Sequence, residues 1–313
     1  MADTASTRQA AGETLVELGA EMPNLVVLGG DLNISTFASL FRDTYPDRFF
    51  DFGPAEQNIV SVAAGLASSG KIPVVSSFAV FSTSRPHDQL RVGVSQPRLN
   101  VKVIATHSGI TVGEDGMSAQ SIEDVALMCA LPEFTVIVPA DGPEAIQAVR
   151  CAVETEGPFY IRLSRSATPV VHSNGNKFAL GKAETLREGS DATVVACGIM
   201  VNIALEAAQT LADSGISCRV LNMATVKPLD EEAIIKAGRE TGAIVSAEEH
   251  FVMGGLGSMV SQVLSREMPV PMELVALTGY AESGVPDALL SKYGLTSQEV
   301  AQAVRKAISR KTG

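Results

Sequence analysis

Short, nearly continuous apolar stretches recur along the first half of the chain, with longer mixed segments between them. The stretches lie at 25–28, 74–75, 101–105, 135–138 and 159–163. Such runs predict strands that are buried on both faces, as in a parallel sheet. The intervening segments 56–69 and 121–131 predict helices. This βαβ order predicts a parallel sheet covered by helices on both faces.

A second alternation of the same kind occupies the rest of the chain. It predicts strands at 192–196, 218–223, 243–247 and 274–277, and helices at 202–214, 229–240, 255–267 and 297–309. Between the two series, residues 166–190 are polar and carry Pro, Asn and Gly, which is typical of a linker. We therefore predict an α/β fold of two doubly wound domains, at 1–170 and 191–313, joined by a linker at 171–190.

Composition and charge restrict the class of partner. The 313 residues suffice for two domains, and 46% of them are hydrophobic. The formal net charge of −11 argues against nucleic acid and against an anionic membrane surface. No apolar signal core opens the chain, no run approaches about 18 apolar residues, and the four cysteines form no CxxC pair. We expect inert buried thiols in a soluble cytoplasmic protein.

Polar or aromatic side chains follow several of the predicted strands in the first half. They are Asp31, Phe78, His107 and Arg165. Ligands of open α/β sheets collect at the carboxyl ends of the strands, so these four side chains are candidates for one site. An acid, an aromatic ring, an imidazole and a guanidinium suit a sugar phosphate, although ordinary loop residues can have the same composition.

Four motifs, in order along almost the whole chain, resemble the transketolase family of thiamine-diphosphate enzymes. They are Gly53-Pro54-Ala55-Glu56-Gln57-Asn58 with Ala63-Ala64-Gly65-Leu66-Ala67, the loop 106–116 ending in Gly113-Glu114-Asp115-Gly116, Leu163-Ser164-Arg165, and Lys227-Pro228-Leu229-Asp230 followed by Glu248-Glu249-His250 and Gly254-Gly255-Leu256-Gly257. The resemblance implies a pyrimidine-binding domain at 1–170 and a transketolase C-terminal domain at 191–313. The second domain would serve mainly for association.

One family motif is missing. No G-D-G occurs in the sequence, although the family uses that motif to hold Mg²⁺ and the diphosphate. The resemblance therefore implies the C-terminal subunit of a split transketolase, whose N-terminal partner supplies the diphosphate-binding domain and holds most of the Mg²⁺ ligands. Two copies would form a dimer core and two partners would complete a heterotetramer. The activity implied is transfer of a two-carbon glycolaldehyde unit from a ketose phosphate to an aldose, in pentose phosphate metabolism.

The resemblance also implies a role for individual residues. Glu56 matches the catalytic glutamate that hydrogen-bonds the pyrimidine ring of the cofactor and favours its imino tautomer. The expected cofactor contacts are Glu56, Phe78, Phe81 and Asp31, and the expected substrate contacts are Arg8, Ser35, His107, Asp115 and Arg165. Two family positions differ, because Ser84 stands in place of a third aromatic residue and Ala119 in place of a histidine near the reacting carbons.

Other functions stay open at this point. Within the same cofactor class, the chain could be the β subunit of a 2-oxo acid dehydrogenase or an enzyme similar to 1-deoxyxylulose-5-phosphate synthase. The Gly113-Glu114-Asp115-Gly116 loop and Arg165 favour transketolase over both. A non-catalytic partner subunit is a third alternative, supported by Ala119 and opposed by the presence of Glu56. A nucleotide-binding oxidoreductase lacks its strand–GxGxxG–helix motif here.

Overall fold

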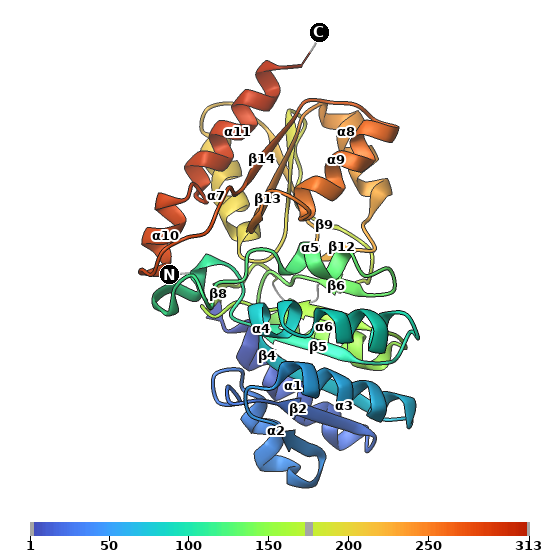
Figure 1. Ribbon diagram of the computed structural model, residues 1–313. Coiled ribbons are helices and arrows are strands. Elements are labelled where there is room, and N and C mark those ends of the chain that lie inside the picture. Colours follow the sequence, from blue (N-terminus) through green and yellow to red (C-terminus); the bar gives the residue numbers. More distant parts are fainter. Residues whose placement is uncertain (1–2, 173–177, 312–313) are drawn as a thin grey trace.

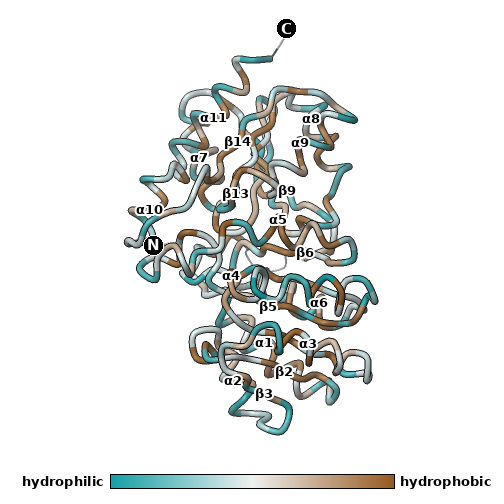
Figure 2. The backbone as a smooth tube through the Cα atoms, in the orientation of Figure 1, coloured by the Kyte–Doolittle hydropathy of each residue, from teal (hydrophilic) through white to brown (hydrophobic). Residues whose placement is uncertain are grey.

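Two α/β units follow one another along the chain. The computed structural model describes residues 3–172 and 178–311, so residues 173–177 of the predicted linker lie outside the described part. In Figure 1 the first half of the chain lies at the bottom and the second half at the top. Figure 2 shows that the hydrophobic segments run through the strands and the helix faces that cover them. No helix among the described residues has the length and apolar character needed to span a bilayer.

A seven-stranded sheet forms the centre of the first unit, in the order β12-β6-β7-β5-β4-β2-β3. Its strands are β2 (Leu25–Gly29), β3 (Phe49–Asp51), β4 (Ile72–Phe78), β5 (Lys102–Thr106), β6 (Thr135–Ile137), β7 (Phe159–Arg162) and β12 (Thr225–Lys227). All neighbours are parallel except β12, which comes from the second half and pairs antiparallel with β6. The sequence did not predict β3 or β12, which are short strands at the two edges of the sheet.

Helices cover both faces of this sheet. They are α1 (Thr7–Glu21), α2 (Ala38–Thr44), the 3₁₀ helix η1 (Pro46–Arg48), α3 (Glu56–Ser68), α4 (Ala79–Ser84), the π-helix η2 (Gln89–Ser95), the 3₁₀ helix η3 (Ile110–Asp115), α5 (Asp124–Cys129) and α6 (Gly142–Glu154). Alternate residues of β2 face opposite sides, as the period of a strand requires. Leu25 and Val27 pack with α1, α2 and α6, whereas Val26 and Leu28 pack with α3 and η2.

A five-stranded sheet, in the order β14-β13-β10-β11-β9, forms the second unit. Its strands are β9 (Glu184–Arg187), β10 (Ala192–Ala196), β11 (Cys218–Asn222), β13 (Ile244–Phe251) and β14 (Met272–Leu277), and its helices are α7 (Met200–Ala212), α8 (Glu231–Thr241), α9 (Leu256–Glu267), α10 (Pro286–Lys292) and α11 (Ser297–Ser309). Antiparallel β9 falls inside the predicted linker. The remaining pairs are parallel. A small two-stranded antiparallel sheet of β1 (Thr4–Ala5) and β8 (Thr168–Pro169) ties the N-terminal segment to the end of the first unit.

Buried charged groups join the two halves. Arg162, at the end of β7, donates from Nε to Asp124 Oδ2 at 2.8 Å and from Nη2 to the carbonyl oxygen of Glu249 at 2.9 Å. The hydroxyl of Tyr160 donates to the same Asp124 oxygen at 2.5 Å. Burial is the largest single influence and opposes ionisation of Asp124, but the charges of Arg162 and His250 and the hydrogen bonds from Arg162 and Tyr160 together lower the pKa of Asp124. The Glu249 carboxylate in turn accepts from the backbone N–H of Thr111 at 2.6 Å. The second half of the chain therefore holds the loop of the first half that carries η3.

His172 lies in a buried group of carboxylates where the first unit ends. Its Nδ1 is 3.0 Å from Asp141 and its Nε2 is 3.2 Å from Glu184. Burial alone lowers the pKa of His172, but the Asp141 hydrogen bond and the surrounding negative charges raise it above 6.5. A histidine with a raised folded-state pKa stabilises the fold at pH values below its unfolded pKa, and this contribution is lost as the pH rises through the folded pKa.

We expect His172→Gln to destabilise the chain more at pH 6 than at pH 9. The protonated imidazole is bound by carboxylates only in the folded state, so the wild-type advantage shrinks as the pH increases. Urea unfolding of both proteins at the two pH values measures this difference. An equal difference in unfolding free energy at the two pH values contradicts the assignment.

Candidate active site

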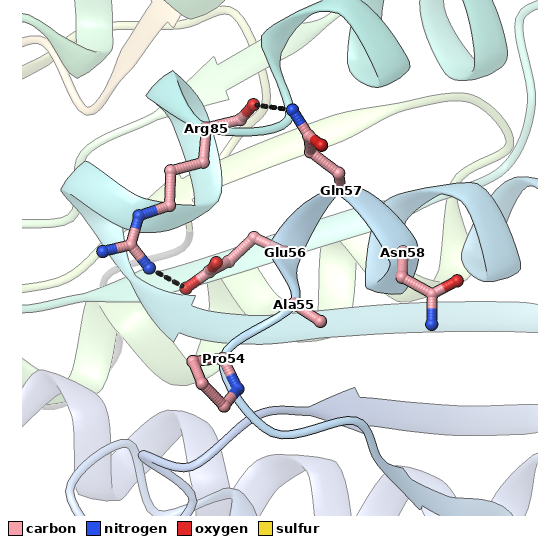
Figure 3. A pocket seen from close by; sticks show the side chains of 6 residues that line it. All are labelled: Pro54, Ala55, Glu56, Gln57, Asn58 and Arg85. Atoms are coloured by element: carbon pink, nitrogen blue, oxygen red, sulfur yellow. Dashed lines mark hydrogen bonds and ion pairs between the residues drawn. The ribbon is translucent and has the colours of Figure 1, made fainter.

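Glu56 is the first residue of α3 and lies in an open pocket of about 480 Å³. Figure 3 shows the pocket, which is lined by Pro54, Ala55, Glu56, Gln57, Asn58 and Arg85. Glu56 is only 7% exposed, whereas the two residues that follow it are exposed. The backbone dipoles at the N-terminus of a helix stabilise a negative charge, so the Glu56 carboxylate can be buried at the start of α3. Arg85 Nη1 donates to Glu56 Oε1 at 2.8 Å.

Aromatic rings form a flat wall beside this carboxylate. β4 ends at Phe78, and Phe81 follows one turn later in α4. Residues three apart on a helix lie on the same side, and the two rings stack with centroids 5.9 Å apart and planes 12° apart. His107 stacks on Phe78 with centroids 3.7 Å apart. The guanidinium of Arg85 lies 4.1 Å from the centroid of Phe81.

Ala119 completes the aromatic wall with a methyl group. It packs in one buried cluster with Phe78 and Val112, against the half-buried Phe81 and Leu32. Ser84, the other position that differs from the family, is exposed, and its hydroxyl donates to the carbonyl of Val80 within its own helix. The aromatic cluster is therefore apolar on the side of residue 119.

Two arginines come together at the carboxyl ends of the first sheet. Arg8 donates from Nε to the carbonyl oxygen of Arg165 at 3.1 Å and from Nη1 to that of Ser35 at 2.6 Å. Burial, together with the charge of Arg165, lowers the pKa of Arg8 from its ordinary value. Burial is also the largest cause that lowers the pKa of His107, to about 3, and both arginines add to it. The imidazole is therefore neutral at physiological pH, and the two guanidinium groups concentrate positive charge at this end of the sheet.

Close packing of Gly12 against Phe37 helps to position Arg8. A Cβ on Gly12 in α1 would lie 2.7 Å from the Cβ of Phe37, so only glycine lets the two segments approach so closely. Phe37 has a φ of 61° and its ring lies 5.2 Å from the Arg8 guanidinium. α1 thereby aims Arg8 at the site. We predicted neither α1 nor the role of Phe37, because α1 is rich in small residues and presents no apolar stripe.

The loop that carries η3 is held by Arg165. Arg165 Nη1 donates to the Val112 carbonyl at 2.5 Å and pairs with Glu114 at 3.1 Å. Gly113, with φ of 79°, leaves room for this guanidinium, because an added Cβ would lie 3.3 Å from Nη1. Hydrogen bonding, first by backbone and then by Arg165, lowers the pKa of Glu114. The structure thus pairs Arg165 with Glu114 rather than with the neighbouring Asp115.

The structure brings together most, but not all, of the predicted site residues. Phe78, Phe81 and His107 form one stacked group, and Arg85 connects Glu56 to it. Arg8 and Arg165 form a second group beside His107. Ser35 contributes its backbone carbonyl to Arg8. Asp31 and Asp115 are exposed, and the hydrogen bonds and ion pairs of the described residues do not involve their side chains. Their predicted contacts with cofactor and substrate stay predictions.

Arg85 is the site residue that we missed. It follows α4 directly and reaches both Glu56 and Phe81. Its sequence position carries no signal, because an arginine after a short helix is ordinary on a protein surface. Only the turn of α4 toward α3 places it beside the carboxylate.

The residues present fit the pyrimidine part of thiamine diphosphate. A buried carboxylate next to a flat aromatic wall can bind an amino-substituted nitrogen heterocycle, by hydrogen bonding at its edge and stacking on its face. In the part of the chain that the structure describes, no three His, Cys, Asp or Glu side chains gather as metal ligands. Glu56 and the aromatic wall therefore match the pyrimidine part of the cofactor.

Both halves of the chain match family models. Residues 3–171 match the transketolase pyrimidine-binding domain, and residues 181–300 match the transketolase C-terminal domain. A protein of Methanocaldococcus jannaschii described as a transketolase C-terminal section is 41% identical over 307 residues, which are 97% of this chain and 96% of that protein. A Clostridium protein described as a 6-deoxy-6-sulfo-D-fructose transketolase subunit is 41% identical over 300 residues, covering 96% and 93% of the two chains.

Longer relatives and solved structures are also transketolases. Human transketolase is 36% identical over 312 residues, which are 98% of this chain but 50% of the human protein. A structure described as a split-gene transketolase in an inactive β4 tetramer superimposes with a TM-score of 0.92 at 49% identity, covering 98% of this chain and all of that one. The transketolase of Campylobacter jejuni, at 23% identity and a TM-score of 0.84, shares the fold. The chain belongs to the transketolase family and comprises its pyrimidine-binding and C-terminal domains.

Proposed function

We propose that this chain is the C-terminal subunit of a split transketolase that transfers a two-carbon glycolaldehyde unit from a ketose phosphate to an aldose. The observation that carries the proposal is the buried Glu56 carboxylate beside the stacked Phe78 and Phe81 rings. Thiamine diphosphate, when bound, supplies the carbon nucleophile of the reaction. Glu56 hydrogen-bonds the pyrimidine edge and holds or shares a proton there, and the two phenylalanines support the ring face.

The substrate residues act at the other end of the site. Arg8 and Arg165 offer planar guanidinium groups that suit the oxygens of a sugar phosphate. Neutral His107 lies between these arginines and the aromatic wall, so it can donate to or accept from a sugar hydroxyl without adding charge. Asp115 is proposed to bind a further hydroxyl, and Asp31 to contact the cofactor.

A second polypeptide is part of the proposal. An N-terminal subunit with the diphosphate-binding domain would hold most ligands of Mg²⁺, and two of each chain would form a heterotetramer around a dimer of this one. We propose the cytoplasm as its location, because the four cysteines are free thiols, which a reducing compartment maintains. The domain division at 170 and 190 is likewise our interpretation.

Calorimetric titration of thiamine diphosphate with Mg²⁺ tests the proposal. We expect no saturable binding to the chain alone and binding to its complex with the N-terminal subunit. The complex is then assayed for transfer of the two-carbon unit, with ketose phosphates as donors and an aldose as acceptor. Tight binding to the isolated chain would contradict the split site, and release of CO₂ from pyruvate by the complex would indicate a different reaction of the same cofactor.

Arg165→Gln is expected to raise KM for a phosphorylated ketose by about ten- to a hundredfold, with kcat little changed. This corresponds to loss of a charge-assisted hydrogen bond of about 1.5–3 kcal/mol to the phosphate. Steady-state kinetics with a phosphorylated and a non-phosphorylated ketose measure it. Arg165→Lys keeps the charge but not the planar guanidinium, so its KM for the phosphorylated ketose should lie between those of the wild type and Arg165→Gln. Equal effects on both ketoses would show that Arg165 acts only by holding the loop.

A further inference from the structure

Arg85 occupies the two positions that a bound pyrimidine ring needs. Its guanidinium is 2.8 Å from Glu56 Oε1 and 4.1 Å from the centroid of the Phe81 ring (Figure 3 shows the contact with Glu56). A flat heterocycle that hydrogen-bonds Glu56 and stacks on Phe81 requires the same carboxylate and the same ring. The guanidinium is itself flat and cationic, so it satisfies both groups when the pocket holds no ring.

The geometry allows Arg85 to leave without rearranging the fold. The backbone of Arg85 is held, because Gln57 Nε2 donates to its carbonyl oxygen at 3.2 Å. The side chain, in contrast, is 48% exposed, while that of Glu56 is 8% exposed. Rotation of the arginine side chain into solvent therefore breaks one ion pair and one ring contact. A buried carboxylate without a partner is costly, so the arginine returns whenever the pocket is empty.

We propose that Arg85 is a displaceable latch, which closes the pyrimidine pocket by pairing with Glu56 and opens when the cofactor binds. This inference rests on the proposed function. Binding is then possible only to the open fraction, and the apparent Kd exceeds the intrinsic Kd by the inverse of that fraction. If the latch is closed about nine-tenths of the time, removing it tightens binding about tenfold.

The test compares thiamine diphosphate binding, at saturating Mg²⁺, to the complex of this chain with its N-terminal subunit. Calorimetry gives the Kd, and a chase of labelled cofactor with excess unlabelled cofactor gives the dissociation rate. For Arg85→Gln we expect a Kd lower by about three- to tenfold with an unchanged dissociation rate, because only the open fraction changes. Arg85→Lys, which keeps the ion pair but not the flat contact, should give a smaller gain.

Two controls isolate the latch. Arg91 pairs with Asp88 at 2.8 Å on the surface, so Arg91→Gln removes a similar charge and should leave the Kd unchanged. In a Glu56→Gln background, Arg85→Gln should no longer tighten binding, since the ion pair is already lost. If the wild type binds thiamine diphosphate and Arg85→Gln binds it with an equal or higher Kd, the latch is overturned but the proposed function is not. Absence of binding by the wild type and all variants overturns the proposed function, and the latch with it.

Discussion

We expect Glu56→Gln to lower the transketolase activity of the proposed complex with the N-terminal subunit by about a thousandfold. Glutamine keeps the size of the side chain and can still form a hydrogen bond, but it cannot hold or release the proton at the pyrimidine edge. Positioned acid–base groups contribute about 10²–10⁴-fold, and Glu56 is the buried carboxyl at this wall. Steady-state transfer of the two-carbon unit, with saturating cofactor, measures the loss.

The matched control is Glu267→Gln, at the end of α9 in the second unit. Glu267 pairs with Arg266 at the surface, so the same change in charge and shape should leave activity within about twofold. Gel filtration of each variant with the N-terminal subunit confirms that assembly is intact. If Glu56→Gln retains a tenth or more of the activity, the residue has no catalytic role.

We expect Arg162→Met to destabilise the chain by about 3–5 kcal/mol. Arg162 is 5% exposed and Asp124 is fully buried, so removing the cation leaves an unpaired carboxylate in the interior. The carbonyl of Glu249 also loses its donor, and with it a connection between the two units. Urea unfolding gives the free energy difference. Activity should fall as well, because Glu249 holds the backbone of Thr111 in the loop 106–116, which carries the predicted substrate residues His107 and Asp115.

The double variant with Asp124→Leu distinguishes charge burial from lost volume. Replacing both partners by apolar residues removes the unpaired charge, so the double variant should be more stable than Arg162→Met alone. Arg150→Met is the surface control. Arg150 pairs with three glutamates that are all more than half exposed, and its loss should cost less than about 1 kcal/mol. A double variant less stable than the single one contradicts the argument.

The pattern of hydrophobic and polar residues predicted the strands that bury a continuous apolar stretch and the helices that bury an apolar stripe. The strand predicted at 192–196 is β10, and the helix predicted at 297–309 is α11 with the same bounds. The helix predicted at 121–131 covers only Asp124–Cys129. α1 escaped prediction because Gly12 and Gly19 pack directly against aromatic residues, and such close contacts select small side chains instead of an apolar period.

The sequence by itself determined the fold class, the parallel sheets and the family, because these depend on local period and motif. The same motifs predicted Glu56, Phe78, Phe81 and the two arginines as site residues, and their roles stay predictions. Tertiary structure alone decided which of them meet. It paired Arg165 with Glu114, placed Arg85 between Glu56 and Phe81, and moved β12 into the sheet of the first unit. Such contacts join residues far apart in the chain through the packing of whole elements, and no local pattern of hydrophobic and polar positions encodes them.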